Sequence, residues 1–314
     1  MADAPPSPAR TAAPEPVPSS RPVAGMLWMV LTGLCFVAVT GIVKHVGQDM
    51  PSAQAAFLRF LLGMVFLLPM LPALMRLRIG PGDWPLFGAR SALHVAGVLC
   101  WFYAMAQLPV AEVTAMNYLA PVYVTLGAAL FLGEKLAARR ILAIVAGLVG
   151  VLIILRPGFR EVSTGHLAML ATALLLGGSY LFAKRLSERH DAAVVVAMMS
   201  VMVTVGLAPF AIAVWVPPTA VQIGWLFLVA GFATAGHYAM TRAFAIAPLT
   251  VTQPVTFLQL IWATLVGIVF FAEPADGWVI LGGAVILSAV SFISWREAQL
   301  RRQAITPPPE ATKL

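Results

Sequence analysis

Charged side chains are scarce in this chain. Only 11% of its 314 residues are Asp, Glu, Lys or Arg, whereas soluble domains carry roughly 25%. Cysteine is rarer still: Cys35 and Cys100 each lie inside an apolar run, which argues against a disulfide framework and a cysteine metal site. Because 60% of the residues are hydrophobic and the mean hydropathy is +0.89, we predict an all-α membrane protein with several spans.

The motifs of common enzymes are also missing. The chain has no G-x-x-x-x-G-K phosphate loop, no H-E-x-x-H and no G-x-S-x-G, and no polar segment is long enough for a catalytic domain. We therefore expect no enzyme activity, no cofactor and no bound metal. The net charge of +7 does not indicate nucleic-acid binding, because cytoplasmic loops of membrane proteins carry excess Lys and Arg.

Long apolar runs are what the chain does have. Ten of them approach the ~20 residues that a helix needs to cross a bilayer. They cover residues 24–43, 52–74, 86–108, 110–132, 140–155, 165–183, 194–215, 221–244, 250–272 and 277–295. Outside them, residues 1–23 are rich in Pro, Ala and Ser and are predicted to form a disordered tail, and the polar residues 297–314 are predicted to form a cytoplasmic C-terminal tail.

The basic residues predict the orientation of the spans. If the N-terminus is cytoplasmic, 16 of the 20 Lys and Arg residues fall on the cytoplasmic side, and the four others are Lys44, Arg59, Arg156 and Arg160. Excess basic residues mark the cytoplasmic side of membrane proteins. We therefore predict a multi-pass protein of the plasma membrane, the bacterial inner membrane, with both termini in the cytoplasm.

The first half of the chain recurs in the second half. Gly25 and Lys44 recur as Gly165 and Lys184, and Pro109 and Glu134 recur as Pro248 and Glu273, at almost the same offset along the sequence. Each repeat holds five spans, an odd number, so the second repeat is inverted in the membrane. The predicted domains are a five-helix repeat over 24–155, an external linker over 156–164 and a second five-helix repeat over 165–296. Inverted repeats favour a transport pathway where they meet.

One segment carries a specific resemblance. The sequence LPVAEVTAMNYLAPVYVTLGAALFLGEKL over 108–136, followed by a span with Gly147 and Gly150, resembles the repeat of the drug/metabolite transporter superfamily, in its ten-helix EamA-like family. The second repeat departs from the pattern in having Leu260 opposite Pro121 and Ala272 opposite Gly133. The resemblance covers about 24–296. It implies that spans three, four, eight and nine, with one and six, surround a central cavity.

Polar and aromatic side chains inside the spans are the candidates for substrate contact, because lipid-facing positions favour aliphatic residues. His94 and Trp101, at a spacing of seven, share one face of the third span. The residues predicted to bind substrate are Trp101, Asn117, Tyr118, His237, Tyr238, Gln253, His94 and Trp262. Each also has a purely structural interpretation, as a hydrogen-bonded group between helices or as part of the core.

Arg59 is a cation about two turns inside the second span. It needs a partner or water, and Glu112, near the start of the fourth span, is the acidic residue closest to it in predicted depth. We predict a structural ion pair between Arg59 and Glu112. Substrate contact and a side chain reaching toward the interface are the alternatives.

These features favour a secondary carrier that moves a small organic metabolite by alternating access. The first expectation is export of amino acids or related metabolites. The alternative is uptake of a vitamin or cofactor, such as riboflavin or a nucleoside-like compound, which the tyrosines in the predicted cavity spans make nearly as attractive. A polytopic membrane enzyme acting on lipid is a remote alternative, and a channel lacks the expected rings of like charge. The expected partners are the substrate and the lipid bilayer, with the chain a monomer or a homodimer.

Overall fold

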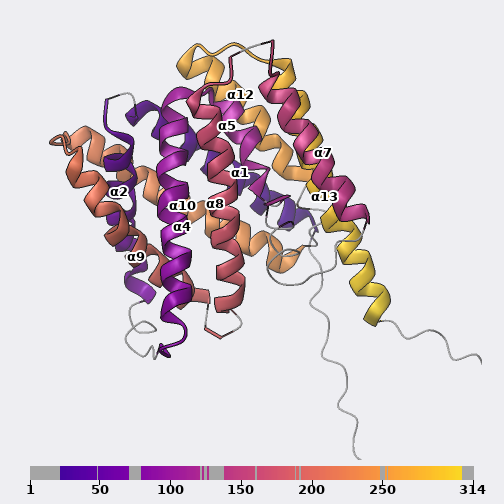
Figure 1. Cartoon of the computed structure of the whole chain (residues 1–314), viewed down its shortest axis with the longest axis horizontal. Helices are drawn as coiled ribbons and strands as arrows, with labels where there is room; N and C mark the ends of the chain where they lie inside the picture. The colour runs from indigo at the N-terminus through magenta and orange to yellow at the C-terminus, as the bar shows by residue number, and fades with distance from the viewer. Residues whose placement is uncertain are drawn as a thin grey trace, which may run out of the picture.

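Helices make up almost all of the protein. The computed structural model describes residues 22–305, except 48, 71–78, 121, 124–125, 127–137, 160, 188, 191, 248–251 and 253. The ten α-helices of this part are α1 (Pro22–Val46), α2 (Ser52–Gly63), α4 (Trp84–Gln107), α5 (Val110–Asn117), α7 (Ala138–Leu155), α8 (Thr164–Ser187), α9 (Ala192–Ala213), α10 (Ala220–Ile246), α12 (Phe257–Phe271) and α13 (Gly277–Ile305) (Figure 1). Two 3-10 segments, η1 (Met64–Met70) and η2 (Pro254–Thr256), extend α2 and precede α12.

The predicted all-α membrane architecture is confirmed. Five helices are long and apolar enough to cross a bilayer, namely Val23–Val46, Trp84–Gln107, Thr164–Ala183, Val194–Ala213 and Ala220–Met240, and four shorter apolar helices accompany them. α13 continues to Ile305, beyond the predicted span end at 295. The residues after 295 include Glu, Ala, Gln, Leu and Arg, which are strong helix formers, so the helix does not need lipid contact to continue.

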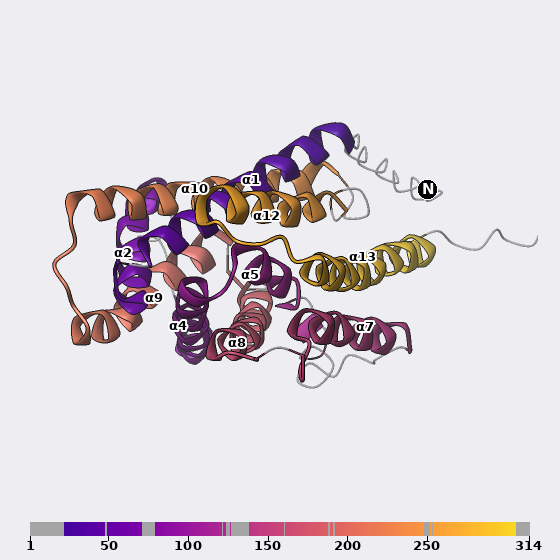
Figure 2. The ribbon, with the colours of Figure 1, turned by 90° about the horizontal axis from the view of Figure 1, so that it is seen from above.

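The packing of the helices follows the inverted repeat. α1 packs along α10 and α4 packs along α8, so the first helix of each repeat lies against the third helix of the other (Figure 2). The last helices, α7 and α13, pack on each other. Gly150 and Gly282 allow this contact, because a Cβ on Gly282 would lie 2.5 Å from the carbonyl oxygen of Gly150. Small residues thus let the two helices approach closely.

The surface and the interior have the polarity expected in lipid. Large apolar side chains such as Leu142, Val205 and Val269 are exposed, and a soluble monomer would rarely expose so many. The buried side chain of Gln54 finds its hydrogen-bond partners inside the bundle. Gln54 is fully buried and bonds the backbone of Val216 twice, its Nε2 donating to the carbonyl at 2.6 Å and its Oε1 accepting from the N–H at 2.8 Å.

Spans four and nine each depart from one continuous α-helix. α5 ends at Asn117 and η2 ends at Thr256, and the offset between these two residues is the one that relates Pro109 to Pro248. In the sequence Pro121 follows Asn117 by four residues, and a proline disfavours a helix that continues through this position. In span nine Leu260 replaces this proline, and Pro254 begins the 3-10 segment that precedes the helix. α5 therefore ends, and α12 begins, at positions that the repeat relates to each other.

Candidate substrate site between the repeats

The end of α5 in span four meets the end of η2 in span nine. The hydroxyl of Tyr118, which follows the last residue of α5, donates a hydrogen bond of 3.0 Å to the carbonyl oxygen of Thr256, the last residue of η2. Asn117 is half-buried beside it. A helix break frees backbone polar groups, and in membrane carriers such breaks commonly lie at the substrate site. The crossing of spans four and nine is therefore the first part of the candidate site.

A cluster of aromatic and cationic side chains forms the second part. The ring of His94 on α4 lies 6.0 Å from the ring of Phe60 on α2, and its Nδ1 lies 3.3 Å from the hydroxyl of Ser179 on α8. The ring of His237 on α10 lies 5.1 Å from that of Phe36 on α1. All distances between rings join their centroids. Five helices from both repeats thus contribute to the cluster.

Arg59 belongs to this cluster. Its guanidinium carbon lies 4.3 Å from the ring centroid of Phe60, and its charge is close enough to act electrostatically on both His94 and His237. A guanidinium over an aromatic face is a favourable contact that becomes stronger away from water. Arg59 therefore brings a guanidinium, which carries five N–H donors, to the same part of the bundle as the two imidazoles.

Two tryptophans of the predicted site lie on α4 and α12. Trp101 is half-buried on α4, two turns from His94 and on the same helical face. Trp262 is half-buried on α12, and its indole packs on α1 at Gly33, where an added Cβ would lie 3.0 Å from the ring. Gly33 thus lets the indole approach the α1 backbone. Both rings offer flat apolar faces near polar groups.

The remaining predicted residues are less central. Tyr238 is 59% exposed and its ring lies 6.1 Å from that of Trp28, edge to face, whereas His237 beside it faces Phe36. Adjacent residues on a helix point about 100° apart, so the two need not share one surface. Gln253 lies outside the described residues.

Glu112 has a different partner from the one predicted. Its Oε2 lies 2.9 Å from Nε2 of His166, the third residue of α8, and both side chains are almost fully buried. The other ring nitrogen of His166 accepts the backbone N–H of Ser163 at 3.0 Å, so Nε2 carries the proton that bonds Glu112. No ion pair joins Arg59 to Glu112 within the described part of the chain. Arg59 is therefore placed with the imidazoles rather than with the acid.

Several neighbours of the site escaped the sequence analysis: Phe36, Phe60, His166, Ser179 and Thr256. Phenylalanine, serine and threonine in spans are too common to stand out. His166 carried a usable signal, because it is a titratable residue directly after Gly165, one of the repeat landmarks. Among the described residues no group of three His, Cys, Asp or Glu side chains gathers as a metal would require.

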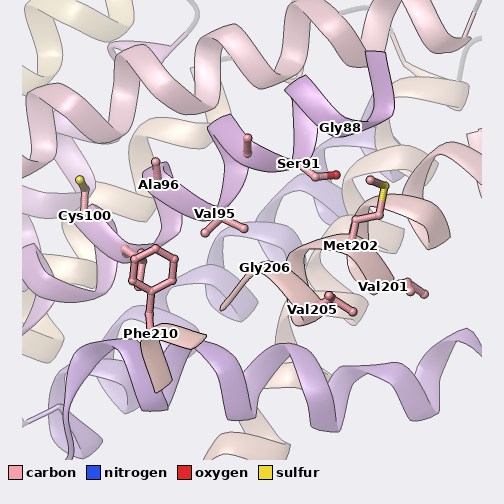
Figure 3. A pocket seen from close by; sticks show the side chains of 12 residues that line it. Gly88, Ser91, Val95, Ala96, Cys100, Val201, Met202, Val205, Gly206 and Phe210 are labelled. Carbon is pink, nitrogen blue, oxygen red and sulfur yellow. The ribbon is translucent and has the colours of Figure 1, made fainter. Parts of the chain in front are cut away.

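A cavity of about 740 Å³ lies elsewhere, between α4 and α9 (Figure 3). Ala92, Ala96 and Leu99 line it from α4, on roughly the opposite helical face from His94 and Trp101. On the α9 side Val205 and Phe210 are exposed, so the cavity opens toward the lipid-facing surface. It is separate from the candidate site.

Known proteins provide a direct comparison. The sequence model of the EamA-like transporter family matches residues 23–156 and 163–295. A riboflavin transporter of Rhizobium johnstonii is 34% identical over 295 residues, which is 91% of this chain and 96% of the relative. A riboflavin transporter of Vibrio cholerae is 29% identical, over 90% and 97% of the two chains. The pseudopaline exporter CntI of Pseudomonas aeruginosa is 26% identical, over 86% and 95%.

A solved structure has the same fold. Its chain superposes on this one with a TM-score of 0.58 at 19% sequence identity, and the match covers 90% of this chain and 99% of the other.

Proposed function

We propose that this chain, which belongs to the EamA-like transporter family and is therefore a membrane transporter of small metabolites and not an enzyme, imports riboflavin across the bacterial inner membrane. In this proposal both termini are cytoplasmic. The end of the bundle uppermost in Figure 1, where α4 ends and α5 and α13 begin, then faces the periplasm. The observation that carries the proposal is the 34% identity with a riboflavin transporter along almost the whole chain.

The chemistry of the candidate site supports the same substrate. Riboflavin has a planar three-ring head, with carbonyl acceptors and one N–H at its edge, and a hydroxylated chain. Trp101 and Trp262 offer flat faces on which such a ring stacks. Arg59 offers donors for the carbonyl edge, and His94 and His237 offer groups that donate or accept. Since riboflavin is uncharged at neutral pH, it brings no charge into the membrane interior.

The charge pattern argues against the first expectation, amino-acid export. A zwitterion needs an anionic partner for its ammonium group as well as a cationic one for its carboxylate. The described acids closest along the chain to the site residues are already engaged: Glu112 with His166, and Glu273 with Lys44. The described residues of the site supply a cation, imidazoles and aromatic rings. That set suits a neutral aromatic compound better.

Uptake assays test the proposal. The purified chain is reconstituted in liposomes, and entry of labelled riboflavin is measured with and without excess lumiflavin, amino acids or S-adenosylmethionine. We expect saturable entry that lumiflavin inhibits and amino acids do not. Trp101→Ala should reduce uptake severalfold by removing a stacking face, Trp101→Phe should retain most of it, and Phe159→Ala, whose ring is 93% exposed in the linker, should have no effect.

The outcome that would overturn the proposal is well defined. Liposomes that are loaded with amino acids and release them through the chain, but take up no riboflavin, would return the function to metabolite export.

A further inference from the structure

An ion pair joins the two repeats at the upper end of the bundle. Lys44, in the last turn of α1, contacts the carboxylate of Glu273, just after the end of α12. The side chains are only 11% and 12% exposed. The ammonium also lies 5.5 Å from the ring centroid of Phe271. The pair therefore closes over the ends of the first and ninth spans in a setting with little water.

Each charge of the pair also meets a helix end of opposite polarity. Nζ of Lys44 donates to the carbonyl of Leu108, at the C-terminal end of α4, at 2.7 Å. Oε2 of Glu273 accepts the N–H of Val110, the first residue of α5, at 2.9 Å. The C-terminal end of a helix is partly negative and its N-terminal end partly positive, so both contacts are favourable. Through these bonds one ion pair ties together the ends of α1, α4, α5 and α12.

The local backbone places the carboxylate for this role. Ala272 adopts a left-handed conformation with φ of 52°, which turns the chain back after α12. Gly267 leaves the space that the carboxylate fills, because a Cβ there would lie 2.3 Å from Oε2 of Glu273. The left-handed turn at Ala272 and the space beside Gly267 therefore keep the carboxylate of Glu273 inside the bundle.

A small apolar cluster lies next to the pair. Val37 on α1, Val110 on α5 and Ala263 on α12 are buried against one another, with Trp262 and Phe271 packed around them. This cluster is built from three of the four elements that the ion pair ties together. It includes a contact with Trp262, one of the candidate substrate residues. A substrate that passes this end of the bundle must separate these elements.

We infer that Lys44 and Glu273 are the gate of the transport pathway at this end. The pair holds the end closed in this structure and breaks when the end opens, as water replaces each partner. The inference rests on transport by the family and not on riboflavin as the substrate. Neutralising either residue removes contacts that exist only in the closed arrangement, and so it shifts the population toward the open one.

Thiol labelling tests the gate without any substrate. In full-length protein with Cys35→Ala and Cys100→Ala, the substitution Ala263→Cys places a thiol in the apolar cluster, at a position that is 0% exposed. Purified in detergent, this protein should react slowly with a maleimide. Adding Lys44→Gln or Glu273→Gln should accelerate labelling on the order of five- to tenfold, given the usual worth of such bonds.

Two controls distinguish opening of the gate from a general destabilisation of the fold. Asp276→Asn removes a second ion pair at this end, between Arg156 and Asp276, which lies beyond the end of α12, and should leave the rate at the parent value. A thiol at the buried Val203→Cys of α9 should stay protected in every variant. The inference is overturned by a parental rate in both neutralised variants, by equal acceleration in Asp276→Asn, or by loss of protection at residue 203. The labelling assay contains no riboflavin. Its result is therefore independent of whether the uptake assay identifies riboflavin as the substrate.

Discussion

The buried pair of Glu112 and His166 makes the most demanding prediction about stability. It links α5 of the first repeat to α8 of the second, with side chains 4% and 6% exposed and 2.9 Å between Oε2 and Nε2. Ser163 holds the imidazole in place, through its N–H at 3.0 Å and its hydroxyl at 2.8 Å from Nδ1. These two contacts with Ser163 fix the orientation of the imidazole toward Glu112.

His166→Ala leaves the carboxylate of Glu112 buried without the imidazole. Removing one member of a buried pair typically costs about 3–5 kcal/mol. Glu112→Gln keeps the shape and one hydrogen bond, so its cost should be nearer to about 1–2 kcal/mol, the difference between charged and neutral bonds. In the double variant no carboxylate is left without its partner. Its loss of free energy of unfolding should therefore be smaller than the sum of the two single losses by about 1–3 kcal/mol.

Unfolding by SDS in mixed micelles measures these free energies, with helicity as the signal. The expected order of free energies of unfolding is parent, Glu112→Gln, then His166→Ala, with the double variant close to His166→Ala or above it. Thr204→Ala, on α9 and outside the pair, serves as a control for a buried polar side chain. The reasoning fails if His166→Ala costs less than about 1 kcal/mol, or if the two single costs simply add.

Three further predictions concern the turns, the loops and the topology. Ala272→Gly should raise the melting temperature, because glycine relieves the left-handed conformation at φ of 52°, worth up to about 1 kcal/mol; a lower melting temperature would contradict the strain. Hydrogen bonds from Arg189 and His190 hold the pKa of Asp83 below its ordinary value. A lowered carboxyl pKa stabilises the fold at pH values above the unfolded pKa of about 3.9 and ceases to do so as pH falls through the folded pKa. Asp83→Asn should therefore lower the melting temperature at pH 7, with the difference from the parent shrinking below about pH 4; a constant difference across that range would show that the charge is not responsible. Finally, a reporter fused after residue 300 should be cytoplasmic and one inserted in 156–163 periplasmic, and a cytoplasmic signal from the second would reverse the proposed orientation.

Hydropathy and local chain chemistry were enough to predict the architecture. The length of an apolar run and the places where Pro and Gly interrupt it are local properties, so the spans, the repeat and its inversion can be read without a structure. The end of α5 at Asn117 differs from the sequence prediction, which has one continuous span over 110–132. Ala272 could be identified as a departure from the Gly133 pattern, but not as a residue held in a left-handed turn.

The partners of the charged residues were decided only by tertiary structure. Sequence gives the approximate depth of a side chain in the membrane, but not the direction in which its helix is turned or which helix lies opposite. Arg59 and Glu112 were matched by depth, yet α5 turns Glu112 toward His166 on α8, while Arg59 lies with His94 and His237. Lys44 was predicted on the outer side and Glu273 directly follows the ninth predicted span, but their contact depends on how α1 and α12 pack. Depth follows from the chain alone, whereas rotation and neighbours follow from packing between segments that lie in different repeats, far apart in the sequence.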